Sequence, residues 1–376
     1  MQVTDRDRHT ARLSATVKPS TTAALCGKPT QTEPPMRHIA NANATRTLTS
    51  AAFCLLTPLL AQAYDLSPGG ALANRITAAQ TTAHQASACV IAQPFYWEVG
   101  NRERMLAGGK AGTQAPGRQT EMALASASKW LYAAYVAEQR QGKLSAQDVR
   151  FLNFQSGHTR FRICLPGQTV GQCQSSLING FGRIDTAKVG LFDYDGGHMQ
   201  KHATLMGLGP MGNAALASTI KMGLQPLAPD WTLSYSQPQL AGGGVSNAAS
   251  YAHFLRSTLK GDLKIGALLG THAVCTNSQT CPDQAIEAPI PLTETWHYSI
   301  GHWVEDDPIV GDGAFSSPGA FGFYPWIDAG KQFYGIVARD DRNTDPNSDS
   351  THSPWLESTN CGRLIRKAWL TGQPQR

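Results

Sequence analysis

Charged residues and long hydrophobic runs are both scarce in this chain of 376 residues. Charged side chains make up 16% of the sequence. The apolar stretch at residues 51–60 is shorter than the roughly 20 residues that a helix needs to cross a bilayer. We therefore expect no stable membrane span in the mature chain. Hydrophobic residues still reach 41%, which is enough for a sizeable core and argues against a disordered chain.

The charge distribution gives no sign of a nucleic-acid partner. The net charge is +5, but residues 1–63 carry +4 of it, which leaves +1 for the remainder. A nearly neutral domain without a run of Lys or Arg lacks the electrostatic footprint of nucleic-acid binding. We expect a small-molecule partner, and the sequence does not specify an oligomeric state.

Several metal and cofactor motifs are missing as well. There is no C-x-x-C pair, no phosphate-binding loop ending in Gly-Lys-Ser/Thr, and no G-x-S-x-G elbow. His198 and His202 have the i, i+4 spacing of a zinc pair, but the Glu of H-E-x-x-H is absent. The Asp/Asn-rich stretch 340–349 lacks the Gly and final Glu of an EF-hand. Acidic residues at 305–307 and Asp312 fall on a predicted connecting loop rather than forming a glycosidase pair. We predict no metal and no cofactor.

The N-terminus has the pattern of an export signal. From Met36, basic residues precede the apolar stretch, and Ala61-Gln62-Ala63 places small residues where signal peptidase cleaves. We predict a non-native or extended leader at 1–35, a signal peptide at 36–63 and a mature domain at 64–376. The protein is then exported, to the periplasm or the medium; a membrane-anchored N-terminus is the alternative.

Six cysteines remain after the predicted leader, an even count that is typical of disulfides in an exported chain. Six cysteines allow 15 pairings. Spacing favours two short links, each closing a polar loop, and leaves one long link between the first strand and the last helix. The predicted pairs are Cys164–Cys173, Cys275–Cys281 and Cys89–Cys361.

Sequence periodicity predicts helices in the middle of the chain and strands towards its two ends. The predicted helices are 65–86, 126–140, 197–209, 213–223, 247–260 and 355–370. The predicted strands are 88–97, 296–304, 319–328 and 332–339. This order indicates one sheet assembled from both ends of the domain, with a helical insertion.

Ser126 and Lys129 form an S-x-x-K motif at the start of a predicted helix. Residues at i and i+3 share a helix face, so the lysine amine can reach the serine hydroxyl. A serine needs such a base to become a nucleophile, and a partly desolvated lysine can serve. The same spacing recurs at 218–221 and 257–260, in polar surroundings that indicate solvated surface. The motif alone is therefore weak evidence for a nucleophile. The surrounding sequence has to show which of the three matches is the candidate site.

The context of Ser126 resembles the serine β-lactamase and penicillin-recognition family, in particular class C β-lactamases and related esterases. The matching segments appear in the family's order and span about residues 88–370. They are Ser126-Ala-Ser-Lys-Trp-Leu with the turn Gln141-Gly-Lys-Leu144, the loop Phe154-Gln-Ser-Gly157, the motif Tyr194-Asp-Gly-Gly197, the segment 222–227, the turn Ala241-Gly-Gly-Gly244 with Tyr251-Ala-His-Phe254, and Ser317-Pro-Gly319 between 298–303 and 322–326.

The resemblance implies an α/β fold of the α+β type: an antiparallel five-stranded sheet flanked by helices, plus a helical lobe. The sheet part would comprise about residues 64–125 and 290–376, and the helical lobe about 126–290. It also implies a serine hydrolase that forms an acyl-enzyme on Ser126. Lys129 would be the base and Tyr194 a proton shuttle. The oxyanion hole would consist of the N–H groups of Ser126 and Ala320.

Departures from the family pattern favour an uncharged substrate. The Asn of the second motif is Gly196 here, and Gln155 is the candidate for replacing its amide. Ser317 stands where the third motif has a cation, ahead of Gly319, so a substrate carboxylate would lack its usual partner. We therefore expect an ester or amide substrate, with β-lactamase or D-alanyl-D-alanine peptidase activity as the alternative. A non-catalytic binding or sensor domain is the alternative from another class.

Tyr235 is a rival for the tyrosine role, because Tyr235-Ser236-Gln237 has an amide at the third place. No helix follows it directly, whereas Tyr194 is followed by a predicted helix. We therefore favour Tyr194.

Overall fold

The computed structural model describes residues 68–342 and 352–376, all within one unit, 63–376. The predicted leader and signal peptide at 1–63 lie outside the described residues, as does most of the Asp/Asn-rich stretch. Within the described residues no helix is long and apolar enough to cross a membrane.

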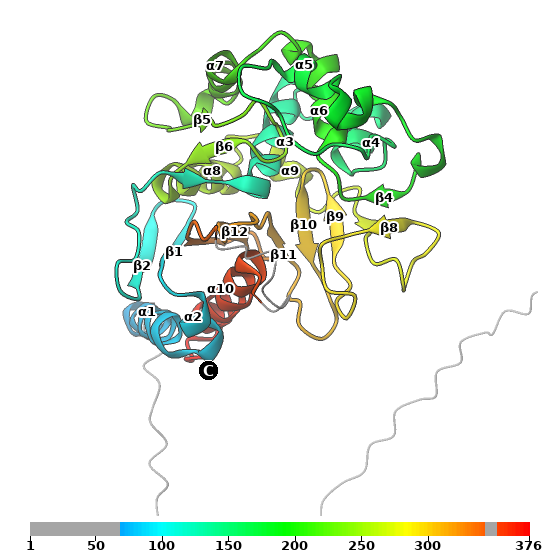
Figure 1. The fold of residues 1–376 in the computed structure, drawn as a ribbon. Helices are drawn as coiled ribbons and strands as arrows, with labels where there is room; N and C mark the ends of the chain where they lie inside the picture. The colour runs from blue at the N-terminus through cyan, green and yellow to red at the C-terminus, as the bar shows by residue number, and fades with distance from the viewer. Residues whose placement is uncertain (1–67, 343–351) are drawn as a thin grey trace, which may run out of the picture. The chain divides into compact units, whose positions relative to one another are not determined.

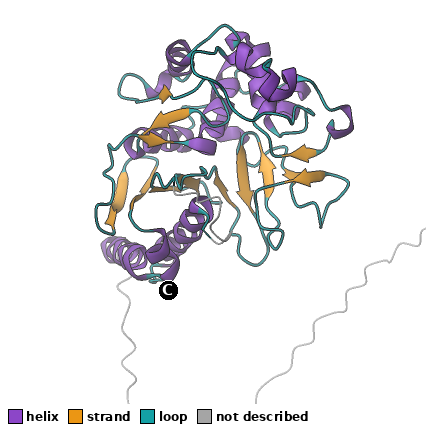
Figure 2. Cartoon of the chain, viewed as in Figure 1, coloured by secondary structure: helices purple, strands orange, loops and turns teal. Residues whose placement is uncertain are grey.

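An antiparallel sheet of eight strands forms the centre of the fold (Figures 1 and 2). Its order is β2-β1-β13-β12-β11-β10-β9-β7. The strands are β1 (Phe95–Asn101), β2 (Met105–Ala111), β7 (Val274–Cys275), β9 (His297–Ser299), β10 (His302–Glu305), β11 (Ala314–Ser316), β12 (Tyr324–Ile327) and β13 (Phe333–Ala338). Smaller pairings are the antiparallel β3 (Met122–Ala123), β6 (Gly244–Ser246) and β5 (Ser234–Tyr235), and the parallel β4 (Phe192–Asp193) and β8 (Ala285–Glu287).

Ten α-helices accompany these strands in the described residues. They are α1 (Pro68–Gln85), α2 (Ser87–Ala92), α3 (Ser128–Gln139), α4 (Ala146–Leu152), α5 (Val170–Gln174), α6 (Gly197–Ala203), α7 (Asn213–Gly223), α8 (Ala248–Lys260), α9 (Ile265–Leu268) and α10 (Pro354–Thr371). A short 3-10 turn, η1 (Ala125–Ala127), leads into α3.

Both faces of the sheet are buried, as β13 illustrates. Val337 packs into one cluster with Cys361 and Trp369 of α10, whereas Ile336 belongs to the other cluster, which contains α3 and α8. Successive side chains on a strand point to opposite faces, so a strand covered on both sides is apolar throughout. In Figure 1, α1 and α10 lie on one side of the sheet and α8 on the other.

The predicted fold class is confirmed, but the strand count is not: eight strands replace five. The five strands β2-β1-β13-β12-β11 are continued by β10, β9 and β7. The predicted strand 296–304 is a hairpin of β9 and β10, because Gly301 turns the chain with φ +67°. A Cβ there would also press on the carbonyl oxygen of Lys129, so this turn lies against α3.

The predicted strand 88–97 is the second correction. Residues 87–92 form α2, and the strand β1 begins only at Phe95, after Pro94. Cys89 and Ala92 are buried on α2 against α10, so packing against that helix determines the local structure.

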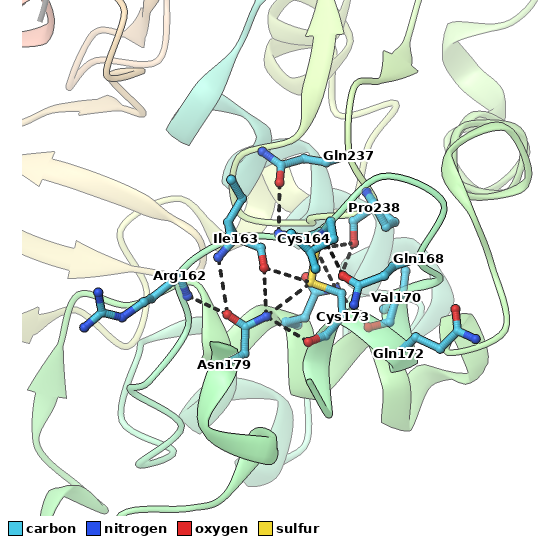
Figure 3. Close-up of a disulfide and its surroundings, with 12 residues drawn as sticks. Arg162, Ile163, Cys164, Gln168, Val170, Gln172, Cys173, Asn179, Gln237 and Pro238 are labelled. Atoms are coloured by element: carbon cyan, nitrogen blue, oxygen red, sulfur yellow. Dashed lines mark hydrogen bonds between the residues drawn. A yellow bond between two sulfur atoms is a disulfide. The ribbon is translucent and has the colours of Figure 1, made fainter. Parts of the chain in front are cut away.

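Three disulfides join the cysteine pairs that the spacing favours. Cys89–Cys361 links α2 to α10 across 272 residues, whereas Cys164–Cys173 and Cys275–Cys281 close short loops. Figure 3 shows the Cys164–Cys173 disulfide next to Asn179.

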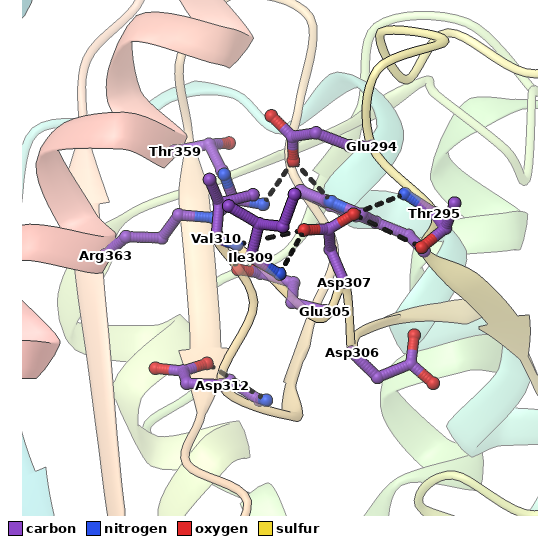
Figure 4. Close-up of polar contacts among 12 residues, drawn as sticks. Glu294, Thr295, Glu305, Asp306, Asp307, Ile309, Val310, Asp312, Thr359 and Arg363 are labelled. Carbon is purple, nitrogen blue, oxygen red and sulfur yellow. Dashed lines mark hydrogen bonds and ion pairs between the residues drawn. The ribbon is translucent and has the colours of Figure 1, made fainter.

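The acidic loop after β10 is structural. The Asp307 carboxylate accepts the N–H groups of Ile309, Val310 and Thr295, which fixes the turn (Figure 4). Glu305 was predicted on the loop but is the last residue of β10, where pairing with Ala314 of β11 continues the strand. It is fully buried and accepts hydrogen bonds from Arg363 and Arg366. Burial alone would raise the pKa of Glu305, but the two arginines hold it below its usual value.

Candidate active site

Ser126 and Lys129 meet at the start of α3. Ser126 is half-buried in η1, and Lys129 lies one turn further along, buried in the first turn of the helix. The Lys129 Nζ lies 2.9 Å from the Ser126 Oγ, within hydrogen-bond distance. The geometry that the i, i+3 spacing predicts is therefore present.

Burial changes the protonation of Lys129. Its Nζ donates to the carbonyl of Ala241 at 2.7 Å and lies 4.7 Å from the centre of the Tyr194 ring. No carboxylate in the described residues forms an ion pair with this amine. Desolvation lowers the pKa of Lys129 to about 7, and the charge of Asp195 opposes this in part. An amine with such a pKa is substantially neutral near neutral pH, as a general base must be.

Tyr194 lies close to both Ser126 and Lys129. The Ser126 side chain and the Trp303 indole each favour the charged form of its phenol and so lower its pKa in part. The Tyr194 and Trp303 rings stack with centroids 5.3 Å apart. Burial raises the pKa of Tyr194 to about 12, so the phenol is neutral near neutral pH and can pass a proton on.

The rival tyrosine lies elsewhere. Tyr235 is on β5, buried in the core near Tyr132, and its hydroxyl has no hydrogen-bond partner among the described residues. Burial raises the pKa of this phenol. Tyr194 is thus the tyrosine that the fold brings to Ser126.

The backbone around Ser126 is held in an uncommon conformation. Ala125, immediately before it, has φ +43°, a region that residues other than glycine seldom occupy. The Ser317 hydroxyl donates to the Ser126 carbonyl at 3.0 Å. The predicted substrate contact at Ser317 is therefore occupied by the nucleophile's own backbone.

Gly319 lets the segment after β11 approach this turn. A Cβ at 319 would collide with the carbonyl oxygen of Leu124. Ala320 follows on the exposed side of the segment. Within the described residues, neither the Ser126 N–H nor the Ala320 N–H donates to a backbone carbonyl, so both predicted oxyanion donors are available for a ligand.

The side-chain amide of Gln239 lies close to Gly196. A Cβ at 196 would lie 3.4 Å from the Gln239 Nε2 and 3.1 Å from the Phe161 ring. The Gln239 side chain has no hydrogen-bond partner among the described residues, and it neighbours Ala241, which binds Lys129. Gln155, the predicted replacement, instead donates its amide to the Gly190 carbonyl.

Asp195 is a further residue of the site, with no role among those predicted from the sequence. Its carboxylate accepts the N–H groups of Gly197 at 2.6 Å and Phe161 at 3.2 Å. Burial raises the pKa of Asp195 to about 6, against the effect of these hydrogen bonds and of Lys129. The sequence signal that points to Asp195 is its position, as an acidic residue directly after the candidate tyrosine.

The histidine pair is engaged in packing. His198 accepts the Ser156 N–H at Nδ1 and donates from Nε2 to the Asp193 carbonyl, while His202 bonds Tyr132 and Asp148. Burial lowers the pKa of His198 to about 3. In the residues that the structure describes, no group of three or more His, Cys, Asp or Glu side chains could hold a metal ion.

Comparison with known proteins gives a result at the level of structure. No protein-family model and no curated protein matches the sequence. Among solved structures, a candidate β-lactamase from Bacteroides dorei DSM 17855 matches at 19% identity and a TM-score of 0.53, covering 73% of this chain and 93% of its own. The chain has the β-lactamase/transpeptidase fold.

Two other proteins of this fold extend the comparison. EstCE1, a hydrolase with promiscuous acyltransferase activity, matches at 12% identity and a TM-score of 0.53, over 77% of this chain and 98% of its own. An octameric penicillin-binding protein homologue from Pyrococcus abyssi matches at 14% identity and a TM-score of 0.52, over 82% and 78%. At such identities the likeness establishes the fold, and the chemistry has to be argued from the residues.

Proposed function

We propose that this protein is a serine hydrolase that cleaves an ester or amide through an acyl-enzyme on Ser126. The observation that carries the proposal is the 2.9 Å contact between the Ser126 hydroxyl and a buried lysine of lowered pKa. The position of Tyr194 supports it, because its ring centre lies 4.7 Å from the Lys129 Nζ and the Ser126 side chain influences the pKa of its phenol. A decayed site would have no reason to keep these three groups together.

The proposed acylation begins with neutral Lys129 taking the proton of the Ser126 hydroxyl. The Oγ then attacks the substrate carbonyl carbon, and the Ser126 and Ala320 N–H groups stabilise the negative oxygen. As the C–O or C–N bond breaks, Tyr194 gives its proton to the leaving group and recovers one from the Lys129 ammonium. The products of this half-reaction are the acyl-serine and a free alcohol or amine.

Deacylation reverses these roles with water as the attacking group. The attacking water loses one proton to the Tyr194 oxygen as the phenol passes its own proton to neutral Lys129, and the new oxyanion forms in the same place. Collapse of this intermediate breaks the acyl–Oγ bond, releases the carboxylic acid and returns the proton to Ser126.

A neutral substrate suits the surroundings of the serine. Ser317 already donates to the Ser126 carbonyl, and it carries no charge with which to bind a carboxylate. The unpartnered Gln239 amide beside Gly196 offers donors and an acceptor to a carbonyl-containing substrate. Esters and amides are therefore favoured over β-lactams and D-alanyl peptides.

We also propose that the protein is exported. Three disulfides suit an oxidising compartment, in agreement with the predicted signal peptide.

A panel of p-nitrophenyl acetate, p-nitrophenyl butyrate, a chromogenic cephalosporin and a D-alanyl amide tests the proposed function. We expect ester turnover that is lost in both Ser126→Ala and Lys129→Ala. Ser218→Ala and Lys221→Met, at the same spacing on α7, are matched controls that keep wild-type rates. Absence of any turnover by folded wild type would favour the non-catalytic alternative, and rapid cephalosporin turnover would contradict the substrate argument.

A further inference from the structure

Exposed apolar side chains are concentrated in one segment beside the candidate site. Of the 16 large hydrophobic side chains exposed in the described residues, seven lie between 163 and 189. They are Ile163, Leu165, Leu177, Ile178, Phe181, Ile184 and Val189. Scattered exposed apolar residues are ordinary, whereas seven within 27 residues make this segment a candidate interaction site.

The same segment is cationic, whereas the mature domain as a whole is nearly neutral. Residues 158–190 contain four basic residues and one acid, a net charge of +3. Arg160, Arg162 and Arg183 are all exposed. Arg160 has only a 3.9 Å contact with Asp185 and keeps 60% of its side chain exposed. The Arg183 guanidinium lies 5.5 Å from the centre of the Phe181 ring, which places charge and apolar surface together.

This segment is firmly held, as Figure 3 shows. The Cys164–Cys173 disulfide closes its first turn. The buried Asn179 amide accepts the Arg162 N–H at 2.7 Å and donates to the carbonyls of Ile163 and Cys173. These contacts hold the segment in an ordered conformation in which its apolar side chains are exposed to solvent. The segment is already folded, so no further folding buries them.

The backbone conformation and exposure of Phe181 give the clearest indication that the exposed side chains of this segment have a function. It has φ +58° between Gly180 and Gly182, whose φ values are also positive. An aromatic residue seldom adopts this conformation, and here 54% of the residue remains exposed. The unfavourable backbone is not compensated by burial in the core, so an external contact is the natural role for this side chain.

We propose that the 158–190 segment docks on an anionic lipid surface. Its apolar side chains would enter the boundary between headgroups and acyl chains, and its arginines would bind phosphate groups. This combination of apolar and cationic side chains is the one that binds peripheral proteins to anionic membranes. The Phe161 N–H contacts the Asp195 carboxylate, so docking would bring the Ser126 site close to the lipid.

Sedimentation of the full chain with lipid vesicles tests this proposal. We expect binding to phosphatidylcholine vesicles that contain phosphatidylglycerol, weakening with added salt, and much less binding to phosphatidylcholine alone. Leu177→Ser combined with Phe181→Ser should lower the partition coefficient by about tenfold or more, because two apolar groups leave the interface. Arg160→Gln combined with Arg162→Gln should remove the preference for anionic lipid.

The controls separate docking from folding and from catalysis. Leu205→Ser and Met222→Ser remove exposed apolar side chains outside the segment and should bind as wild type does. Ser126→Ala should also bind fully, because docking does not depend on acyl chemistry. A wild-type chain that stays in the supernatant with anionic vesicles, equal binding to both lipids, or equal losses in the control variants would overturn the proposal.

Discussion

The pH dependence of ester hydrolysis should follow the titration of Lys129. At its ordinary pKa of 10.5, only about 3 in 10,000 of the lysines would be neutral at pH 7. With the pKa lowered to about 7, roughly half are neutral, a gain of about 10³ in active base. We expect kcat/KM to rise with unit slope up to about pH 7 and then to level off.

Two substitutions make this prediction specific to the lysine. Lys129→Met should lower kcat/KM by about 10²–10⁴ and abolish the inflection, because the general base is gone. Asp195→Asn should move the inflection to lower pH, since the Asp195 charge opposes the lowering of the Lys129 pKa. The assay is initial-rate hydrolysis of p-nitrophenyl butyrate in buffers of constant ionic strength. A midpoint above pH 9, or an unchanged profile in Lys129→Met, would show that Lys129 is not the general base.

The same shift gives a second readout in stability. The folded-state pKa of Lys129, about 7, is below its unfolded value of 10.5, so the unfolded chain binds more protons between these pH values. The free energy of unfolding should therefore gain from this group as pH rises from 7 to 10.5, by at most about 5 kcal/mol. Urea titrations should show that the gain is absent in Lys129→Met.

Three further predictions concern the scaffold and the substrate. Glu305→Gln should lower the free energy of unfolding by about 3 kcal/mol or more in urea titrations, because two largely buried arginines lose the carboxylate that they bind. Glu121→Gln, at an exposed position, is the control and should change the free energy of unfolding little. Cys89→Ser should lower the free energy of unfolding by about 5 kcal/mol and Cys275→Ser by about 2 kcal/mol, because the disulfides close loops of 272 and 6 residues. Equal losses of stability in thermal melts would contradict this dependence on loop length. Gln239→Ala should raise KM about tenfold with a smaller change in kcat, whereas Gln155→Ala should leave both unchanged.

Local sequence patterns predicted the elements that depend on local contacts. The helix containing Lys129, the helix near the C-terminus and the strand at 333–338 follow from periodicity, because their apolar faces are continuous in sequence. The order of motifs predicted the fold class. The segment 88–97 was predicted as a strand because its apolar run suits one, but α10, far away in sequence, buries its first half as a helix.

The parts of the site that the sequence did not reveal depend on contacts between distant segments. Gln239 belongs to the turn before β6, and this turn lies beside Gly196, which is 43 residues earlier in the chain. The Ser317 hydroxyl was expected to face substrate, and its bond to the Ser126 carbonyl depends on how closely β11 approaches η1. Neither distance is encoded in a motif, since each joins residues tens to hundreds of positions apart.

Labelling with a fluorophosphonate, followed by peptide mapping, shows whether Ser126 is the nucleophile. We predict one adduct, on Ser126, formed at a rate that falls sharply in Lys129→Met and is unchanged in Lys221→Met. A folded wild-type protein that acquires no adduct, or an adduct that persists in Ser126→Ala, would contradict this prediction.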